Sequence, residues 1–233
     1  MRFKFSAMIL AAGYGKRMLP LTKDIPKPLI EVNGITLLDN SINFLKKLGC
    51  DQIIINSHYL YPKIEAAIKS RITKDNITLI HEKEILNTGG GVKNAIPFLK
   101  NKNLLIINSD VLWLNENLID VTSLIRNYQK NFSPNLLLVN KKNAFGIKKT
   151  QGDFILNKNK ILRSKNDDKI IFYTGLQILN VNIFKEFFLD NFSFNIIWDF
   201  YINKNKLCGQ IMHSNWYHVG DIQGLVIARE LGS

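Results

Sequence analysis

The chain has 233 residues, of which 46% are hydrophobic and 21% are charged, a balance that excludes an intrinsically disordered protein. Its 31 basic and 19 acidic residues give a formal charge of +12, which favours anionic partners such as nucleic acid, a membrane surface or phosphorylated small molecules. No apolar run approaches the ~20 residues of a membrane helix, and the apolar start at 7–12 is shorter than a signal-peptide core, so we expect a cytoplasmic protein.

The first half of the chain alternates compact apolar runs with helical patterns. Strands are expected at 5–11, 53–55, 77–80 and 104–107, and helices at 36–49, 62–70 and 91–99. Thr36 with Asp39 resembles a capping box, and Gly49 supplies a stop for the first of these helices. Such alternation implies right-handed crossovers and predicts an α/β fold: a Rossmann-like three-layer αβα sandwich with a mostly parallel central sheet.

Ligands of open α/β sheets bind at the carboxyl ends of the strands. In this chain those ends carry Gly13, Ser57, His58, His81 and Asp110. The sequence therefore predicts a binding site formed by the loops that contain these residues.

The second half is more mixed. Strands are expected at 136–139 and 170–178, a hairpin over 153–162 with its turn at 157–159, and helices at 181–189, 194–203 and 222–231. We find no linker, repeat or low-complexity tract, so the expected organisation is a single domain over 1–233.

The most informative segment follows the first strand. Residues 10–22 read LAAGYGKRMLPLT, and 26–29 read PKPL. Glycines at 13 and 15 let backbone N–H groups approach phosphate oxygens closely, while Arg17 and Lys27 can neutralise phosphate charge. The segment is not the dinucleotide fingerprint, because Met18 occupies the third glycine position, nor a P-loop, because Arg17 follows Lys16 where Ser or Thr would hold magnesium.

This pattern resembles the sugar-1-phosphate nucleotidylyltransferase family, whose signature reads L-A-A-G-x-G-x-R-M-x-P-L-T followed by P-K-P-L. Further matching segments span nearly the whole chain: TGGG at 88–91, NSD at 108–110, FG at 145–146, TG at 174–175 and WYHVG at 216–220. The TGGG form and the absence of a C-terminal extension most resemble the branch that acts on N-acetylmuramate 1-phosphate with UTP. The resemblance implies a fold of the nucleotide-diphospho-sugar transferase type, with a nucleotide-binding part at about 1–110 and a sugar-phosphate-binding part at about 111–233.

The resemblance also implies the reaction and its residues. A sugar-1-phosphate oxygen attacks the α-phosphorus of a nucleoside triphosphate, and pyrophosphate leaves. Because the second pKa of the nucleophile is about 6, no general base is required, and catalysis depends on aligning and neutralising two polyanions. Arg17 is assigned to the triphosphate and departing pyrophosphate, and Lys27 to the α-phosphate and incoming phosphate. The nucleotide would contact Leu10, Ala11, Ala12, Gly13, Gly15, Arg17, Lys27, Thr88, Gly89 and Gly90, and the sugar phosphate Gly146, Thr174 and Gly175.

By the same resemblance Asp110 is the metal ligand. Mg²⁺ typically takes one or two carboxylates together with substrate phosphates. His218 stands where the family pattern has a second aspartate, and imidazole suits Mn²⁺ or Co²⁺ better than Mg²⁺. Three interpretations remain open: His218 ligates the metal, it holds a metal-bound water, or Asp110 and phosphates suffice.

Other functions are compatible with the same residues. Within the family these are mannose-1-phosphate guanylyltransferase and other hexose-1-phosphate nucleotidylyltransferases; in a different class stands a catalytically silent sugar-nucleotide sensor with a degraded metal site. An RNA-binding module would show a basic stripe interleaved with aromatic residues, which the sequence lacks. The expected partners are therefore a nucleoside triphosphate and a sugar 1-phosphate, neither nucleic acid nor membrane, for a monomer or homodimer active in nucleotide-sugar biosynthesis for the cell wall.

Overall fold

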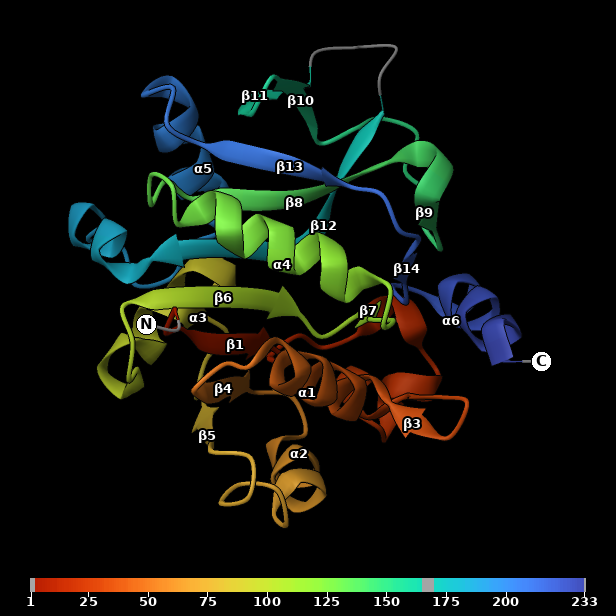
Figure 1. The fold of residues 1–233 in the computed structure, drawn as a ribbon. Helices are drawn as coiled ribbons and strands as arrows, with labels where there is room; N and C mark the ends of the chain where they lie inside the picture. The colour runs from red at the N-terminus through yellow and green to blue at the C-terminus, as the bar shows by residue number, and fades with distance from the viewer. Residues whose placement is uncertain (1–2, 165–169, 233) are drawn as a thin grey trace.

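The computed structural model describes residues 3–164 and 170–232, and a nine-stranded sheet forms its centre (Figure 1). In sheet order the strands are β10 (Phe154–Asn157), β11 (Lys160–Arg163), β13 (Cys208–Met212), β8 (Asn135–Asn140), β12 (Ile171–Asn180), β6 (Asn103–Asn108), β1 (Ser6–Leu10), β4 (Gln52–Ser57) and β5 (Ile77–His81). The predicted strands of the first half and the predicted hairpin are confirmed.

The pairing of the sheet divides it into two parts. Strands β6, β1, β4 and β5 are parallel neighbours, as expected. Beyond β6 the sheet is mixed, because β12 runs antiparallel to both β6 and β8, while β13 is parallel to β8. A parallel return needs a long crossover, usually a helix, whereas the described residues between β8 and β12 include the β10–β11 hairpin and no α-helix. The prediction of a mostly parallel sheet therefore holds for the first half and needs this correction in the second.

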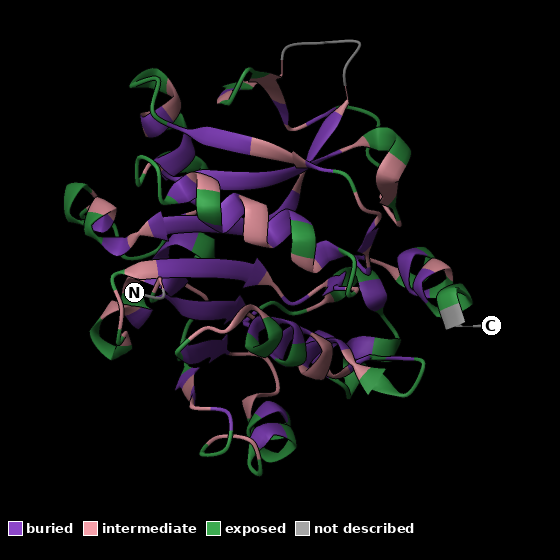
Figure 2. Cartoon of the chain, viewed as in Figure 1, coloured by how far each residue is buried: buried purple, intermediate pink, exposed green. Residues whose placement is uncertain are grey.

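Helices cover both faces of the sheet (Figure 1). One face carries α1 (Leu37–Leu48), α2 (Tyr61–Ile68) and α4 (Asn117–Tyr128), and the other α3 (Asn87–Ala95) and α5 (Phe194–Asn203). Neighbouring residues of one strand supply the two cores: Ala7 and Ile9 of β1 face the first group of helices, and Met8 faces the second. The central strands are buried almost throughout (Figure 2), which confirms the three-layer prediction. Within the described ranges, no helix has the length and apolar character needed to cross a membrane.

A smaller sheet extends one end of the molecule. It consists of β7 (Val111–Leu112), β14 (Trp216–His218) and β9 (Ala144–Phe145), and α6 (Ile222–Arg229) packs beside it. Residues far apart in the sequence thus meet next to the end of β6. A two-stranded ribbon, β2 (Glu31–Val32) and β3 (Ile35–Thr36), precedes α1.

The local helix signals have mixed outcomes. Helix α1 is capped as predicted: the Asp39 backbone N–H donates to Thr36 Oγ1 at 3.0 Å, and Gly49 ends the helix in a left-handed conformation with φ 79°. The helix expected at 181–189 is wrong, because only a 3₁₀ turn forms over Val181–Glu186. Phe187 is extended and contacts Phe192 and Phe200, so aromatic packing takes the chain out of the helical path. Helix α4 and strands β13 and β14 were not predicted.

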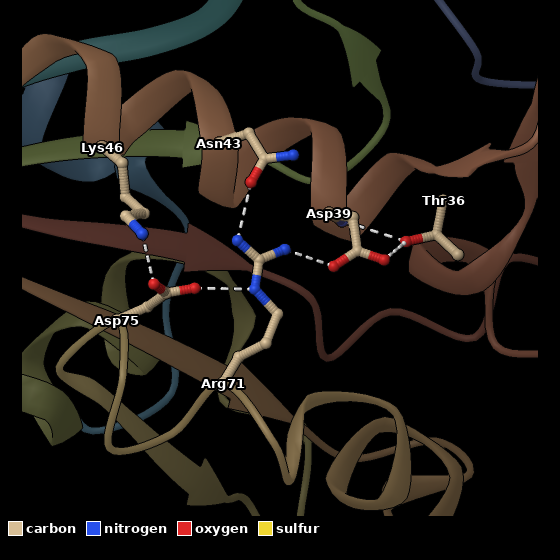
Figure 3. A network of polar contacts seen from close by, with 6 residues as sticks. All are labelled: Thr36, Asp39, Asn43, Lys46, Arg71 and Asp75. Atoms are coloured by element: carbon tan, nitrogen blue, oxygen red, sulfur yellow. Dashed lines mark hydrogen bonds and ion pairs between the residues drawn. The ribbon is translucent and has the colours of Figure 1, made fainter.

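A charged network fixes α1 against the segment that follows α2 (Figure 3). Arg71 donates to Asp75 at 2.7 Å through Nε, to Asn43 at 2.7 Å through Nη2, and to Asp39. Lys46 of α1 pairs with Asp75, whose side chain is 1% exposed. Burial alone would raise the pKa of Asp75, but hydrogen bonds from Lys46 and Arg71 outweigh it and lower that pKa below its usual value of 3.8.

Asp75→Asn is therefore expected to lower the free energy of unfolding by about 2 kcal/mol at about pH 7, since charge-assisted hydrogen bonds to a buried carboxylate are lost. A carboxyl group with a depressed folded-state pKa stabilises the protein above its unfolded pKa of about 3.9, and this stabilisation is lost as the pH falls through the folded-state value. The difference between wild type and variant should shrink below about pH 4. Urea unfolding across this pH range measures it, and a difference that stays constant would contradict the assignment.

Candidate active site

A cavity of about 510 Å³ opens at the carboxyl ends of β1, β4, β5 and β6. The strand order reverses at β1. The next strand of the main sheet along the chain, β4, lies on one side of β1, and β6 lies on the other side. Ligands of open α/β sheets bind at such a switch point. A cavity thus lies at the predicted place, and of the strand-end residues named from the sequence Gly13 and Asp110 line it, whereas Ser57, His58 and His81 do not.

Most of the predicted nucleotide-site residues line this cavity. They come from the loop after β1, the turn that contains Lys27, the start of α3 and the end of β6, and they are Leu10, Ala11, Ala12, Gly13, Gly15, Arg17, Lys27, Thr88 and Asp110. Gly220, from the predicted C-terminal motif, joins them. Predicted residues that lie outside the cavity lining are Gly89, Gly90, Gly146, Thr174 and Gly175. His218 does not line the cavity either, but its Nε2 lies 3.4 Å from Oδ2 of the lining residue Asp110.

Lys27 and Asp110 form the charged centre of the cavity. Lys27 Nζ donates to Asp110 Oδ2 at 2.7 Å and to the Gly220 carbonyl at 3.4 Å, and the two side chains are only 11% and 19% exposed. Burial by itself would raise the pKa of Asp110, but the Lys27 ammonium and the His218 imidazole hold that pKa well below its usual range. The cavity therefore contains an ionised carboxylate beside a cation.

His218 completes this centre from β14. Its Nε2 lies 3.4 Å from Asp110 Oδ2, its Nδ1 lies 3.4 Å from the Gly146 carbonyl oxygen, and its ring stacks on Trp216 with 5.3 Å between centroids. The predicted pair of metal-site residues is thus adjacent in space, although Asp110 and His218 lie 108 positions apart in the sequence.

The donor set can be compared with the needs of a divalent cation. Within the described ranges, no group of three or more His, Cys, Asp or Glu side chains could hold a metal ion. Asp110 can supply one carboxylate inside the cavity, and Mg²⁺ commonly takes its remaining ligands from water and substrate phosphates. The residues therefore fit a cation that binds together with a phosphorylated substrate.

The two glycines of the loop after β1 have different surroundings. Gly15 adopts φ +67°, and a Cβ there would lie 3.0 Å from the Thr22 methyl carbon and 3.1 Å from Lys27 Cβ. Thr22 Oγ1 also donates to the Gly15 carbonyl at 3.0 Å. A Cβ on Gly13 would meet no protein atom within 4 Å, although Gly13 lines the cavity. The backbone conformation and close packing at position 15 thus require glycine, whereas the free space at Gly13 is available to a ligand.

This contrast gives a matched pair of variants. Gly15→Ala is expected to lower the free energy of unfolding by about 1–2 kcal/mol, because a side chain is forced into the left-handed region. Gly13→Ala should leave stability unchanged within about 0.5 kcal/mol but weaken nucleoside triphosphate binding roughly tenfold, because its methyl group occupies space that a phosphate needs. Urea unfolding and calorimetric binding measure the two effects. Unchanged binding by the folded Gly13→Ala variant would exclude a ligand at this position.

The glycines of α3 differ from the sequence prediction. The helix was expected from Gly91 but begins at Asn87, so all of them are helical. A Cβ on Gly89 would lie 2.5 Å from the Phe192 ring, and one on Gly90 would lie 2.1 Å from the Asp190 carbonyl oxygen. These two glycines let the chain at 190–192 approach the helix closely. Contact of Gly89 and Gly90 with a nucleotide stays a prediction. Thr88 lines the cavity and is better placed for such a contact.

The predicted sugar-site residues lie outside the cavity lining and pack against residues next to it. Thr174 is fully buried, and its Oγ1 donates to the Leu137 carbonyl at 2.9 Å. Gly175, at φ +81°, makes room for the side chain of Asn108, which lines the cavity. A Cβ on Gly146 would lie 2.2 Å from the His218 carbonyl oxygen. Direct contact of these residues with a sugar also stays a prediction.

Sequence analysis missed two buried polar residues of the cavity wall. Asn56 Oδ1 accepts from the Ala11 backbone N–H at 3.0 Å, and its Nδ2 donates to Glu82 Oε1 at 2.7 Å. Both side chains line the cavity although Asn56 is only 3% and Glu82 only 2% exposed. The available signal was a polar residue directly after the apolar run 53–55; the neighbouring residues Ser57 and His81 were considered instead.

Comparisons with known proteins agree with this geometry. The family model described as nucleotidyl transferase matches residues 6–163. The N-acetylmuramate alpha-1-phosphate uridylyltransferase of Caulobacter vibrioides is 30% identical over 95% of this chain and 94% of its own. The D-glycero-alpha-D-manno-heptose 1-phosphate guanylyltransferase of Campylobacter jejuni is 29% identical over 81% of this chain and 82% of its own. The crystal structure of HddC from Yersinia pseudotuberculosis superposes with a TM-score of 0.78 over 98% of this chain and 99% of its own, and at 22% identity it supports the fold alone.

Proposed function

Since the chain belongs to the nucleotidyl transferase family, we propose that it transfers a uridylyl group from UTP to N-acetylmuramate 1-phosphate and releases pyrophosphate. At the coarser level it is a sugar-1-phosphate nucleotidyltransferase. The observation that carries the finer proposal is the similarity to the Caulobacter uridylyltransferase, because that similarity covers 95% of the chain, whereas the similarity to the Campylobacter guanylyltransferase covers 81%.

The chemistry requires alignment and charge neutralisation rather than a base. The attacking sugar-phosphate oxygen is already anionic at neutral pH, since its second pKa is about 6. Lys27, fixed by Asp110 and the Gly220 carbonyl, is positioned to bind the α-phosphate and the incoming phosphate. Arg17 lines the same cavity from an exposed position, where it can bind the triphosphate and then the departing pyrophosphate. The two cations offset the repulsion between the substrates and the charge of the transition state.

Asp110 is the residue that we propose holds Mg²⁺, with His218 beside it as a second contact or as the holder of a bound water. The cation, when bound, would neutralise phosphate charge as a Lewis acid. Asp110 remains ionised because of Lys27 and His218, so its carboxylate is available without prior loss of a proton.

The cavity wall also supports the choice of base. Glu82 Oε1 accepts from Asn56 Nδ2 at 2.7 Å and Oε2 accepts from the Leu86 backbone N–H at 3.4 Å, and each carboxylate oxygen keeps a second lone pair that can accept from a base. The imino N3–H of uracil is a matching donor, whereas N3 of cytosine is an acceptor and would face Glu82 unfavourably. We therefore expect UTP to be used well and CTP poorly.

A second candidate is guanylyl transfer to a heptose 1-phosphate. The Campylobacter guanylyltransferase supports it with 29% identity over 81% of this chain. Guanine also presents donors on its Watson–Crick edge, so Glu82 is compatible with GTP.

The test is pyrophosphate release from UTP, GTP, CTP and dTTP, each paired with N-acetylmuramate, heptose, mannose, glucose and N-acetylglucosamine 1-phosphates, in Mg²⁺ and in Mn²⁺. The highest kcat/KM is expected for UTP with N-acetylmuramate 1-phosphate. A higher value for GTP with heptose 1-phosphate would establish the second candidate. Nucleotide binding without pyrophosphate release in any pair would instead favour the sugar-nucleotide sensor.

A further inference from the structure

Tyr14 stands between Gly13 and Gly15 at the tip of the loop that follows β1. Its ring contacts the segment between β4 and α2, with 5.6 Å between its centroid and that of His58 and 5.6 Å to that of Tyr59. The Tyr14 hydroxyl lies 3.4 Å from His58 Nε2. Tyr14 lines the cavity and is 44% exposed, so an aromatic ring at the cavity mouth docks on a second aromatic surface.

The docking surface is itself hydrogen-bonded to two neighbouring segments, one after β5 and one at the turn Leu21–Lys23. His58 Nδ1 lies 2.8 Å from the Glu82 carbonyl oxygen; since a carbonyl only accepts, we assign the hydrogen to Nδ1, which leaves Nε2 to accept from Tyr14. The Tyr59 hydroxyl lies 3.0 Å from the Thr22 carbonyl oxygen and 2.9 Å from that of Lys23. His58 thus connects the loop tip to the segment that carries Glu82.

The loop needs such a contact because of its composition. Gly13 has no side chain and allows a wide range of backbone conformations, whereas the Gly15 carbonyl is held by a hydrogen bond from Thr22 Oγ1 at 3.0 Å. Lys16 and Arg17 are exposed, and Lys16 Nζ lies 5.3 Å from the Tyr14 ring itself. Within residues 13–17, the Tyr14 ring therefore provides the side-chain contact between the loop and the β4–α2 segment.

We propose that Tyr14 is a positioning residue that docks the loop on His58 and Tyr59 and so orders it before the triphosphate binds. A loop that is already ordered spares the ligand the entropic cost of ordering it. The identity of the ligand as a nucleoside triphosphate rests on the proposed function. Through His58, the same contact joins the proposed phosphate-binding loop to the segment of the cavity wall that contains Glu82.

Tyr14→Ala is expected to raise the KM for the nucleotide roughly tenfold and to change kcat less than about threefold, because binding in ground state and transition state is weakened equally. Tyr14→Phe keeps the ring contacts and should stay within about twofold of wild type. Tyr61→Ala is the matched control, since the Tyr61 ring stacks on His81 with 4.1 Å between centroids and its hydroxyl donates to Glu65 at 2.8 Å. A Tyr14→Phe variant as impaired as Tyr14→Ala, or a fall in kcat at unchanged KM, would overturn the proposal.

Tryptic cleavage after Lys16 and Arg17 provides a readout that does not need turnover. Undocking should expose these bonds, so Tyr14→Ala is expected to be cut severalfold faster there than wild type or Tyr14→Phe. Equal cleavage rates would overturn the docking proposal even in an active enzyme. If no pair of substrates turns over, the proposed function fails, and the cleavage comparison still decides whether Tyr14 docks the loop.

Discussion

Lys27→Ala is expected to lower kcat by about two to three orders of magnitude, because a fixed charge aimed at the reacting phosphates is lost from a partly buried site. Lys27 Nζ is held at 2.7 Å from Asp110 and at 3.4 Å from the Gly220 carbonyl, so its position is defined before substrate arrives. Lys27→Arg should recover only part of the activity, since the planar guanidinium does not reproduce a compact ammonium in that geometry. Steady-state pyrophosphate release at saturating substrates measures both variants.

The matched control is Lys23→Ala. Lys23 lies on the neighbouring turn Leu21–Lys23, is exposed and does not line the cavity, so its loss should leave kcat and KM unchanged. Removing Lys27 also leaves the buried Asp110 carboxylate without its ion-pair partner, which can lower the stability of the protein. Thermal unfolding is therefore measured in parallel, so that rates are corrected for the folded fraction. A folded Lys27→Ala variant that keeps more than about a tenth of the wild-type kcat would contradict the assigned role.

The sequence was informative where the signal is local. The cap at Thr36, the stop at Gly49 and the alternation of strands and helices depend on nearest neighbours along the chain. Asp110 was expected beside the loop after β1 because the carboxyl ends of parallel strands lie at one edge of the sheet. The family resemblance added Arg17 and Lys27, and all three residues line one cavity.

Other features depend on contacts that a single sequence does not encode locally. An apolar run predicts a buried strand but carries no direction, so the antiparallel course of β12 could not be derived from its composition. A glycine indicates a close approach without naming the partner. For Gly89 that partner is the Phe192 ring and for Gly175 it is Asn108, whereas Gly13 faces open space. The pair of Asn56 and Glu82 likewise joins the ends of two strands across the sheet.

Asp110 is the other residue whose loss should have a large effect. Asp110→Asn preserves the shape of the side chain but removes the charge that pairs with Lys27 and that a divalent cation requires. We expect kcat/KM to fall by about a hundredfold and the Mg²⁺ concentration for half-maximal activity to rise roughly tenfold, since a cation ligand is weakened and substrate phosphates must supply more of the binding.

Asp221→Asn separates a cation-ligand role from a general loss of negative charge. Asp221 Oδ1 accepts the Gly224 N–H at the start of α6, and its Oδ2 pairs with Lys148 at 3.1 Å. Asparagine can still cap a helix, so this variant should remain folded with an unchanged Mg²⁺ requirement. Calorimetric titration of Mn²⁺ in the presence of a non-hydrolysable UTP analogue provides a second measurement, independent of turnover. If Asp110→Asn binds Mn²⁺ as tightly as Asp221→Asn, the cation is held by phosphates and His218 rather than by Asp110.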